Sequence, residues 1–320
     1  MNDETAMSNF SSLSSSPSRS AVAPAWLADA TTFQRRLARF NAQRIAPAQP
    51  HDDWAAEVQR EAQMRLEEGA FLENLRAGVV ARAAAAPTEA DAFVAWFEQL
   101  EQNGPGQHDP LFEWLARSAT REQMLWFLRQ EVAGEAGFDD LLAYTQVKLP
   151  TLPKLEMARN FWDEMGRGSR KGMHGPMLSD LATEVQLNAD IDATVWEALA
   201  LANAMLGLAL NRRYAYHAIG ALGIVEQTAP GRVQQVGSGL KRLGFSARQR
   251  IYFDLHSAMD IRHSASWNAQ VIHPLVAANS ALAPSIAEGA LIRLSCGARC
   301  FERYRAELWR RPHIAPHERE

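Results

Sequence analysis

Almost the whole chain beyond its first two dozen residues follows a helical period, and this pattern constrains the fold more than any other feature. Apolar side chains recur every three or four residues in long segments with few glycines and prolines. The alternation of valine, isoleucine and threonine that is typical of strands is nearly absent. Amphipathic helices bury their apolar faces against one another. The sequence therefore predicts an all-α protein without a sheet.

The predicted helices are long, and most of the loops between them are short. The clearest linker is the segment Asn-Gly-Pro-Gly-Gln-His-Asp-Pro at residues 103–110. Because the other loops are short, we expect neighbouring helices to pack antiparallel. Helical periodicity is found at residues 26–45, 53–84, 88–102, 110–117, 119–147, 153–166, 174–186, 192–226, 230–243, 246–276 and 281–310.

These patterns predict three parts of the chain. Residues 1–23 are rich in serine, alanine, proline and asparagine, so we expect a disordered tail there. Residues 24–105 form an N-terminal helical extension, and residues 106–312 form the main domain. The first residues lack the cationic start and the apolar segment of a secretory signal.

Composition excludes several classes of protein. The chain has 320 residues, 47% of them hydrophobic, and a net charge of −4, values that are typical of an ordinary globular protein. Nothing is basic enough to indicate nucleic acid as the main partner. No run of eighteen apolar residues is present, so we expect no membrane span. Two cysteines do not imply a disulfide framework, and we therefore expect a cytoplasmic protein.

The segment 254–264 is the most informative one for function. It places His256, Asp260 and His263 at positions i, i+4 and i+7, which share one face of a helix. Two imidazoles and a carboxylate are the ligands of non-heme iron or manganese centres. A solvated polar stripe on an amphipathic helix is the alternative interpretation. The flanking stretch 248–265 has no glycine or proline and is rich in apolar residues, so a buried face would need a metal to satisfy these groups.

Further carboxylates stand in unusual surroundings. Asp163 and Glu164 end a helix, where their charge opposes the helix dipole, so we expect compensation by a nearby cation or by a metal. The candidate cations are Arg167, Arg170 and Lys171. Eight of the ten residues before Glu226 are apolar or glycine. That glutamate is either buried and paired or emerges into water at a helix end near Pro230.

Two glutamates earlier in the chain are also candidates. Glu131 and Glu135 lie one turn apart on the same face of a predicted helix, next to Trp126, Phe127 and Leu128. The remaining histidines have no partner at ligand spacing, so we expect them to be structural or exposed. They are His51, His108, His217 and His273.

The order and spacing of these residues resemble a known ligand pattern. Glu164, His174 ten residues later, Glu226 and then the segment from His256 to His263 are similar to the pattern of the heme-oxygenase-like diiron oxidases and oxygenases, also described as iron-containing redox enzymes. The stretches 161–178 and 220–226 resemble the two most specific blocks of that family. The resemblance covers roughly residues 111–311.

The resemblance implies a heme-oxygenase-like bundle of about seven core helices and two iron ions held by carboxylates and histidines. The family also uses a glutamate on the first core helix, for which we prefer Glu135 and keep Glu131 as the alternative. The expected metal ligands are Glu135, Glu164, His174, Glu226, His256, Asp260 and His263.

The implied function is that of an O2-dependent non-heme diiron oxidoreductase. We favour amine N-oxygenation of a small nitrogen-bearing metabolite, because Arg159, Arg213, Tyr214 and Tyr216 could line a polar pocket. Desaturation or C–C cleavage of an aliphatic amino or fatty acid is the alternative. The expected partners are the substrate and O2, while an electron donor and a homodimer are left open.

Three other classes of protein compete with this interpretation. The first is a binding or storage protein that uses the bundle without redox turnover. The second is a hydrolase with a cysteine nucleophile, which is weak because Cys296 and Cys300 lie late in the chain. The third is a mononuclear iron or manganese enzyme that uses only His256, Asp260 and His263.

Overall fold

Helices account for nearly all of the regular structure in the computed structural model. The structure describes residues 29–50, 53–135, 138–188 and 190–310, without the side chains of residues 133–135, 138 and 257–261. Within these ranges no strand is formed, and the single β-bridge joins Met165 to Met173. The all-α prediction is confirmed. The predicted tail at 1–23 lies outside the described residues.

The thirteen α-helices of the described residues follow the predicted order with some changes of boundary. They are α1 (Ala30–Ile45), α2 (Trp54–Ala83), α3 (Ala90–Asn103), α4 (Pro110–Arg117), α5 (Arg121–Glu135), α6 (Phe138–Thr145), α7 (Thr151–Glu164), α8 (His174–Glu184), α9 (Trp196–Leu210), α10 (Ala215–Arg242), α11 (Ala247–Trp267), α12 (His273–Ala278) and α13 (Ala283–Leu308).

Side-chain caps fix several of the helix starts. Ser246 and Gln249 form a reciprocal capping box at the start of α11. Asp109 accepts a hydrogen bond from the amide of Leu111, and Pro110 occupies the first position of α4. These local signals set where the helices begin, and α11 is the helix that carries three of the expected ligands.

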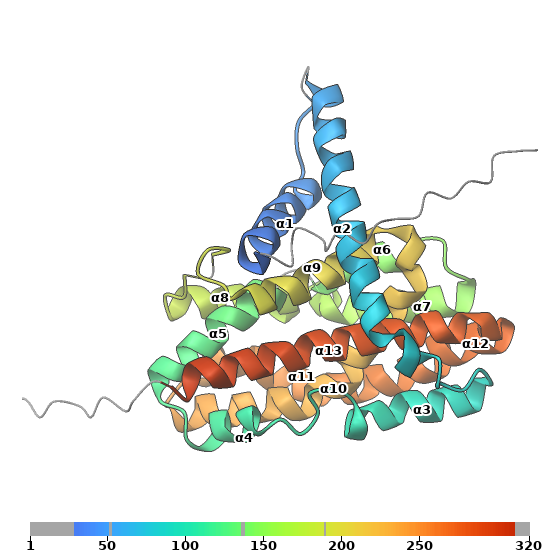
Figure 1. Cartoon of the computed structure of the whole chain (residues 1–320). Coiled ribbons are helices and arrows are strands. Elements are labelled where there is room, and N and C mark those ends of the chain that lie inside the picture. Colours follow the sequence, from blue (N-terminus) through green and yellow to red (C-terminus); the bar gives the residue numbers. More distant parts are fainter. Residues whose placement is uncertain (1–28, 51–52, 136–137, 189, 311–320) are drawn as a thin grey trace, which may run out of the picture.

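Helix α10 lies at the centre of the bundle and packs between α11 and α13 (Figure 1). Two glycines allow α10 and α13 to approach closely. A Cβ atom at Gly220 would lie 1.9 Å from the carbonyl oxygen of Ile286, and one at Gly289 would lie 1.8 Å from that of His217. Only glycine fits at such a crossing, so these two positions hold α10 and α13 in their contact.

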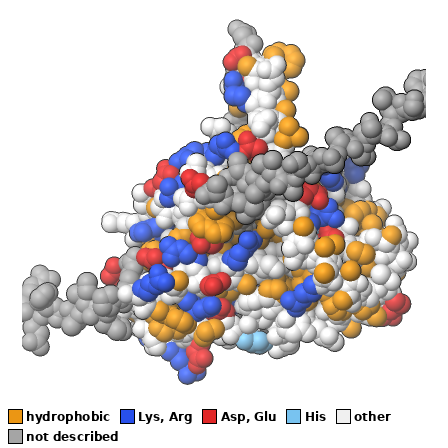
Figure 2. Space-filling model, viewed as in Figure 1, with side chains coloured by type: hydrophobic (Ala, Val, Ile, Leu, Met, Phe, Trp, Pro, Cys, Tyr) orange, Lys and Arg blue, Asp and Glu red, His pale blue; other side chains and the backbone are white. Residues whose placement is uncertain are grey.

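The N-terminal helices pack onto this bundle. Helix α1 contacts α9, and α2 contacts α13. Phe71 of α2 and Phe97 of α3 belong to the same apolar cluster as the core of α10 and α13. The first half of α2 extends beyond the bundle (Figure 1), and Trp54, Val58 and Leu66 are exposed on it. Figure 2 shows hydrophobic side chains along one side of this projection. The division at residue 105 stays a prediction.

Two predicted helix boundaries near α10 are wrong. The helix predicted at 192–226 is two helices, separated at Asn211, whose side chain accepts a hydrogen bond from the amide of Arg213 and competes with helix continuation. The predicted break near Pro230 is absent, because α10 runs through this proline to Arg242. Packing of α10 on both sides outweighs the one backbone hydrogen bond that a proline removes.

Helix α11 does not continue regularly to the predicted end at 276. A π-helical turn at Asn268–Ile272 separates it from α12. Such turns insert one extra residue into a helix. As for membrane spans, no single helix of the described residues is long and apolar enough for one. One pair of stretches, Arg262–Ala278 and Ser280–Leu308, meets the criteria together and is bent by 114°.

Candidate metal centre

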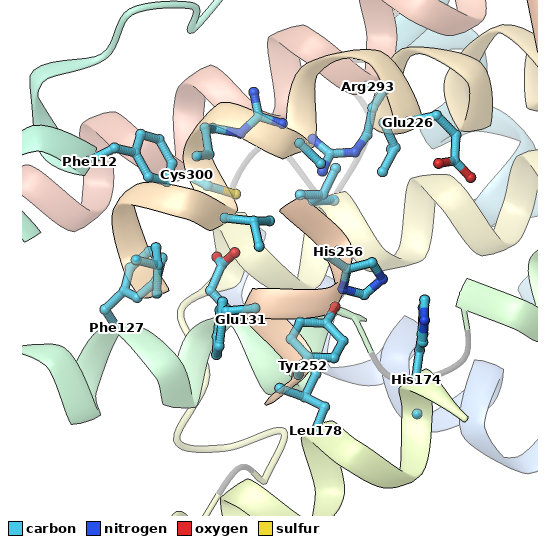
Figure 3. A pocket seen from close by; sticks show the side chains of 18 of the residues that line it. Phe112, Phe127, Glu131, His174, Leu178, Glu226, Tyr252, His256, Arg293 and Cys300 are labelled. Carbon is cyan, nitrogen blue, oxygen red and sulfur yellow. The ribbon is translucent and has the colours of Figure 1, made fainter. Parts of the chain in front are cut away.

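Four helices bring five of the expected ligands to one place. Glu164 ends α7, His174 begins α8, Glu226 lies in α10, and His256 and His263 lie on α11. Helix α11 contacts α7, α8 and α10, and these contacts explain why residues a hundred positions apart meet. Figure 3 shows His174, Glu226 and His256 around one pocket.

The five side chains form two groups that share one carboxylate. Glu164, His174 and His256 each offer one ligand atom, and these atoms lie within 4.8 Å of one another. Glu164, Glu226 and His263 meet the same condition. Carboxylates and imidazoles around two neighbouring points, with one carboxylate common to both, suit a pair of transition-metal ions.

The hydrogen bonding of the histidines also fits a metal. Both ring nitrogens of His174 and the Nδ1 atoms of His256 and His263 are buried without a hydrogen-bond partner among the described residues. Nδ1 of His174 nevertheless lies 2.5 Å from Oε2 of Glu164, and Nδ1 of His263 lies 3.4 Å from Oε2 of Glu226. Burying a polar atom without a hydrogen-bond partner is costly. The histidine nitrogens and carboxylate oxygens that converge here without hydrogen-bonding one another therefore indicate a metal ion bound between them. The residues fit iron.

A tight glycine turn between α7 and α8 places Glu164 beside His174. Gly166 has a φ of +60°, and a Cβ atom there would lie 2.3 Å from the carbonyl carbon of Gly172. An isolated β-bridge between Met165 and Met173 joins the two sides of this turn. As a result, Glu164 and His174, which are ten residues apart in sequence, are in direct contact.

The expected cation beside Asp163 is Arg167. Its Nε atom lies 2.6 Å from Oδ1 of Asp163, one turn along the chain. Burial alone would raise the pKa of Asp163, but the hydrogen bonds and charges of Arg167 and His263 lower it below its ordinary value. Asp163 therefore stays ionised between these two cationic partners.

Two residues of α7 support the ligands: Asn160, which the sequence analysis missed, and Asp163, for which it expected only a compensating cation or a metal. Nδ2 of Asn160 donates a hydrogen bond of 2.7 Å to Oε1 of Glu226, and both side chains are buried. Oδ2 of Asp163 lies 3.2 Å from Nε2 of His263. Such outer partners fix the orientation of a ligand and the tautomer of a histidine. In the sequence, the only indication of these roles was position, since Asn160 lies one turn before Glu164 and Asp163 lies directly beside it.

The site perturbs its titratable groups in different directions. Burial raises the pKa of Glu164 above its ordinary value. Burial also lowers the pKa of His256 well below its ordinary value, helped by the charges of His174 and His263. For His263 burial acts in the same direction, but Glu226 and Asp163 outweigh it and raise the pKa to about 9. Clusters of this kind are typical of functional sites.

A cavity of about 110 Å³ adjoins the two ligand groups (Figure 3). Its walls are mostly apolar, and they come from α4, α5, α6, α7, α8, α9, α10, α11 and α13. Tyr252 packs edge-on against His256, with ring centroids 4.3 Å apart. The other polar groups at the cavity wall, besides the ligands, are Glu131, Asp139, Arg232, Arg293 and Cys300.

Two of the seven expected ligands are outside the described side chains, namely Glu135 and Asp260. Glu131 lines the cavity, but it does not belong to either group of converging ligand atoms found among the described residues. The choice between Glu135 and Glu131 therefore stays a prediction.

The residues expected to form a polar pocket do not line the cavity. The hydroxyl of Tyr214 donates a hydrogen bond of 2.5 Å to Glu73 instead, and Arg159 pairs with Glu156 at the surface. Arg213 and Tyr216 are likewise absent from the cavity wall. For Arg213, Tyr214 and Tyr216 the reason is the break at Asn211, which ends α9 before this segment.

The remaining histidines and cysteines behave largely as expected. His217 pairs with Glu288 at 2.8 Å, and His273 pairs with Asp91 at 3.0 Å. Cys300 does line the cavity, but burial raises the pKa of its thiol well above the ordinary value. A nucleophilic cysteine needs a lowered pKa, so the hydrolase alternative is disfavoured.

Fold and site together define an all-α, heme-oxygenase-like protein with a carboxylate and histidine site for iron. The sequence profile of the iron-containing redox enzymes matches residues 125–298, which is more than half of the chain and includes all five converging ligands. The chain belongs to this family and is an iron oxidoreductase. No curated protein matches the chain.

Proposed function

We propose that the protein is an O2-dependent non-heme diiron oxidase or oxygenase that acts on a small organic molecule. The observation that carries this proposal is the pair of ligand groups sharing Glu164. A mononuclear enzyme needs only one group of two histidines and a carboxylate. A storage protein does not require an apolar cavity beside the ligands.

The described residues would hold and orient two iron ions. Glu164 would be common to both, with His174 and His256 on one side and Glu226 and His263 on the other. When bound, the two ions would supply the electrons that O2 requires. Asn160 and Asp163 keep Glu226 and His263 in place, and Glu135 or Glu131 together with Asp260 complete the proposed ligand set.

The apolar cavity would exclude water and hold the body of the substrate beside the ligands. Two reactions fit this space. Glu131 at the wall could accept a hydrogen bond from an ammonium group, which supports N-oxygenation of an amine. The predominance of apolar walls, together with a cationic side chain, supports desaturation or C–C cleavage of an aliphatic acid, and the cavity favours this second reaction.

Anaerobic titration of the full chain with Fe(II) tests the proposal. We expect binding to saturate at two iron ions per chain, followed by O2 consumption when a substrate is present. Saturation at one ion would favour the mononuclear enzyme instead. Incubation with amines and aliphatic acids under 18O2 separates the reactions, because label on nitrogen marks N-oxygenation, whereas an unlabelled alkene or dehydro product marks the alternative.

A further inference from the structure

We propose that Arg293 binds a carboxylate group of the substrate and that the cavity therefore selects compact carboxylic acids. This rests on the proposed function only in taking the cavity beside the ligands as the substrate site. The assignment depends on the surroundings of one guanidinium group, on the space kept for it, and on the nature of the walls around it.

Arg293 is a buried cation that has no partner among the described side chains. It lies on α13, lines the cavity and is 9% exposed. Within the described part of the chain it forms no hydrogen bond or ion pair. By contrast, Arg44, whose side chain is 9% exposed, has the carboxylate of Glu68 at 2.6 Å. Burying a guanidinium without an anion is costly, so a cation in this state indicates that its partner is a ligand.

The helix leaves room for this guanidinium. Gly297 lies one turn after Arg293, and a Cβ atom there would be 2.9 Å from Nη1 of Arg293. Because Nη1 is the far end of a flexible side chain, a larger residue at position 297 would displace the guanidinium of Arg293. Glycine at position 297 therefore keeps Arg293 against the helix surface, with its donors facing the cavity.

Glu131, an acidic residue of the same cavity wall, has a different partner. Arg293 and Glu131 reach into the cavity from different sides (Figure 3). Glu131 forms a hydrogen bond with Tyr304, which contributes to the raised pKa of that tyrosine after burial and the charge of Cys300. No ion pair joins Arg293 to Glu131 within the described residues. No anion among the described residues is therefore paired with Arg293, which leaves this role to a ligand in the cavity.

The surroundings define the rest of the ligand. Arg232 adds a second positive charge, its guanidinium lying 5.6 Å from the ring centre of Phe301 and 5.9 Å from that of Phe112. Phe127 and Leu178 line the same cavity. A planar guanidinium can donate two hydrogen bonds to the two oxygens of a carboxylate. The apolar walls suit the hydrocarbon part of the same ligand.

The size of the cavity sets the size of the acid. A cavity of roughly 150 Å³ accommodates benzene, and this one measures about 110 Å³. Because this cavity is smaller, it limits the acid to about four or five non-hydrogen atoms. Suitable probes are acetate and propanoate, each compared with the neutral amide of the same chain length.

Equilibrium binding to the full chain tests the assignment without turnover. Calorimetric titrations with propanoate and propanamide are carried out without O2, on the metal-free and on the Fe(II)-loaded protein. We expect propanoate to bind roughly tenfold more tightly than propanamide, since a charge-assisted hydrogen bond is lost in the amide. Arg293→Met should abolish this preference in the metal-free protein, and Arg293→Lys should retain part of it. Gly297→Ala should weaken it as well.

The control is Arg159→Met, because Arg159 is 60% exposed and does not line the cavity. Equal affinity for acid and amide, an unchanged preference in a folded Arg293→Met variant, or no binding of either acid up to about 10 mM would each overturn the assignment. A failure of the diiron proposal is recognised separately, by an iron stoichiometry below two, while the preference for the acid persists.

Discussion

Replacement of Asn160 by leucine should weaken iron binding without unfolding the protein. Nδ2 of Asn160 donates a hydrogen bond of 2.7 Å to Oε1 of Glu226, and both residues are 3% exposed. Its Oδ1 atom is buried and has no hydrogen-bond partner among the described residues. Leucine has the same number and branching of side-chain heavy atoms and is somewhat bulkier, so the substitution removes the donor and an unpaired acceptor without opening a cavity.

The expected magnitude follows from these contacts. A hydrogen bond to a buried charged group contributes about 1.5–3 kcal/mol. Loss of an outer partner of a metal ligand typically lowers metal affinity by about ten- to a hundredfold. We therefore expect Asn160→Leu to raise the dissociation constant for Fe(II) within that range. The free energy of unfolding of the metal-free protein should change by much less, because the unpaired Oδ1 is removed at the same time.

A matched control is provided by Asn41, which lies far from the site. Its Nδ2 atom donates a bond of 2.9 Å to Asn203, it is equally buried, and its Oδ1 atom also lacks a partner. Asn41→Leu should affect stability in a similar way but leave iron binding unchanged. The measurement is an anaerobic Fe(II) titration in competition with a chelator, alongside chemical unfolding of the metal-free variants.

Two results would refute this reasoning. Wild-type affinity for Fe(II) in Asn160→Leu would mean that Glu226 needs no outer partner or is not a ligand. Equal weakening of iron binding by Asn160→Leu and Asn41→Leu would mean that general loosening of the bundle, rather than the bond to Glu226, sets the affinity.

Three further perturbations have clear expected outcomes. His256→Ala should lose iron by metal analysis and keep its helical circular dichroism, whereas the exposed His273→Ala should keep both. Gly289→Ala should lower the free energy of unfolding by about 1–3 kcal/mol or more, because the added methyl group clashes with α10. Gly78→Ala, with nothing within 4 Å of the added methyl group, should raise it by up to about 1 kcal/mol. Equal effects of the two substitutions would contradict the close contact of α10 and α13. Burial lowers the pKa of His217, so the unfolded state binds its proton more readily. Stability linked to His217 should be present above about pH 6.5 and fall as the pH is lowered through this value, and an unchanged slope in His217→Gln urea titrations would count against it.

Periodicity was sufficient to predict most of the fold. Segment 110–117 is observed with its predicted bounds, and the spacing of His256 and His263 placed both on one helix face beside the carboxylates. Periodicity reports which face is apolar, and that face is set by local sequence. It does not report which helices pack on both sides, and for this reason the continuation of α10 through Pro230 was missed.

The outer residues of the site could not be predicted for a related reason. An asparagine or aspartate on a helix is equally compatible with solvent and with a buried partner. Asn160 acquires its role only because α7 packs close enough to α10 for its amide to reach Glu226, across 66 residues of sequence. Arg293 likewise looks like any arginine of an amphipathic helix until the cavity beside it is known.

Pro230 has a consequence for the local stability of the site. A proline has no amide hydrogen, so the carbonyl group of Glu226, four residues earlier, receives no helical bond from it. The turn of α10 that carries this carboxylate is therefore held by one bond fewer than its neighbours, a difference of about 1 kcal/mol. Backbone amides in this turn should exchange with deuterium sooner than those around Gly220, where α13 presses on the same helix. The chain thus combines a rigid crossing at one end of α10 with a turn of lower local stability at the ligand.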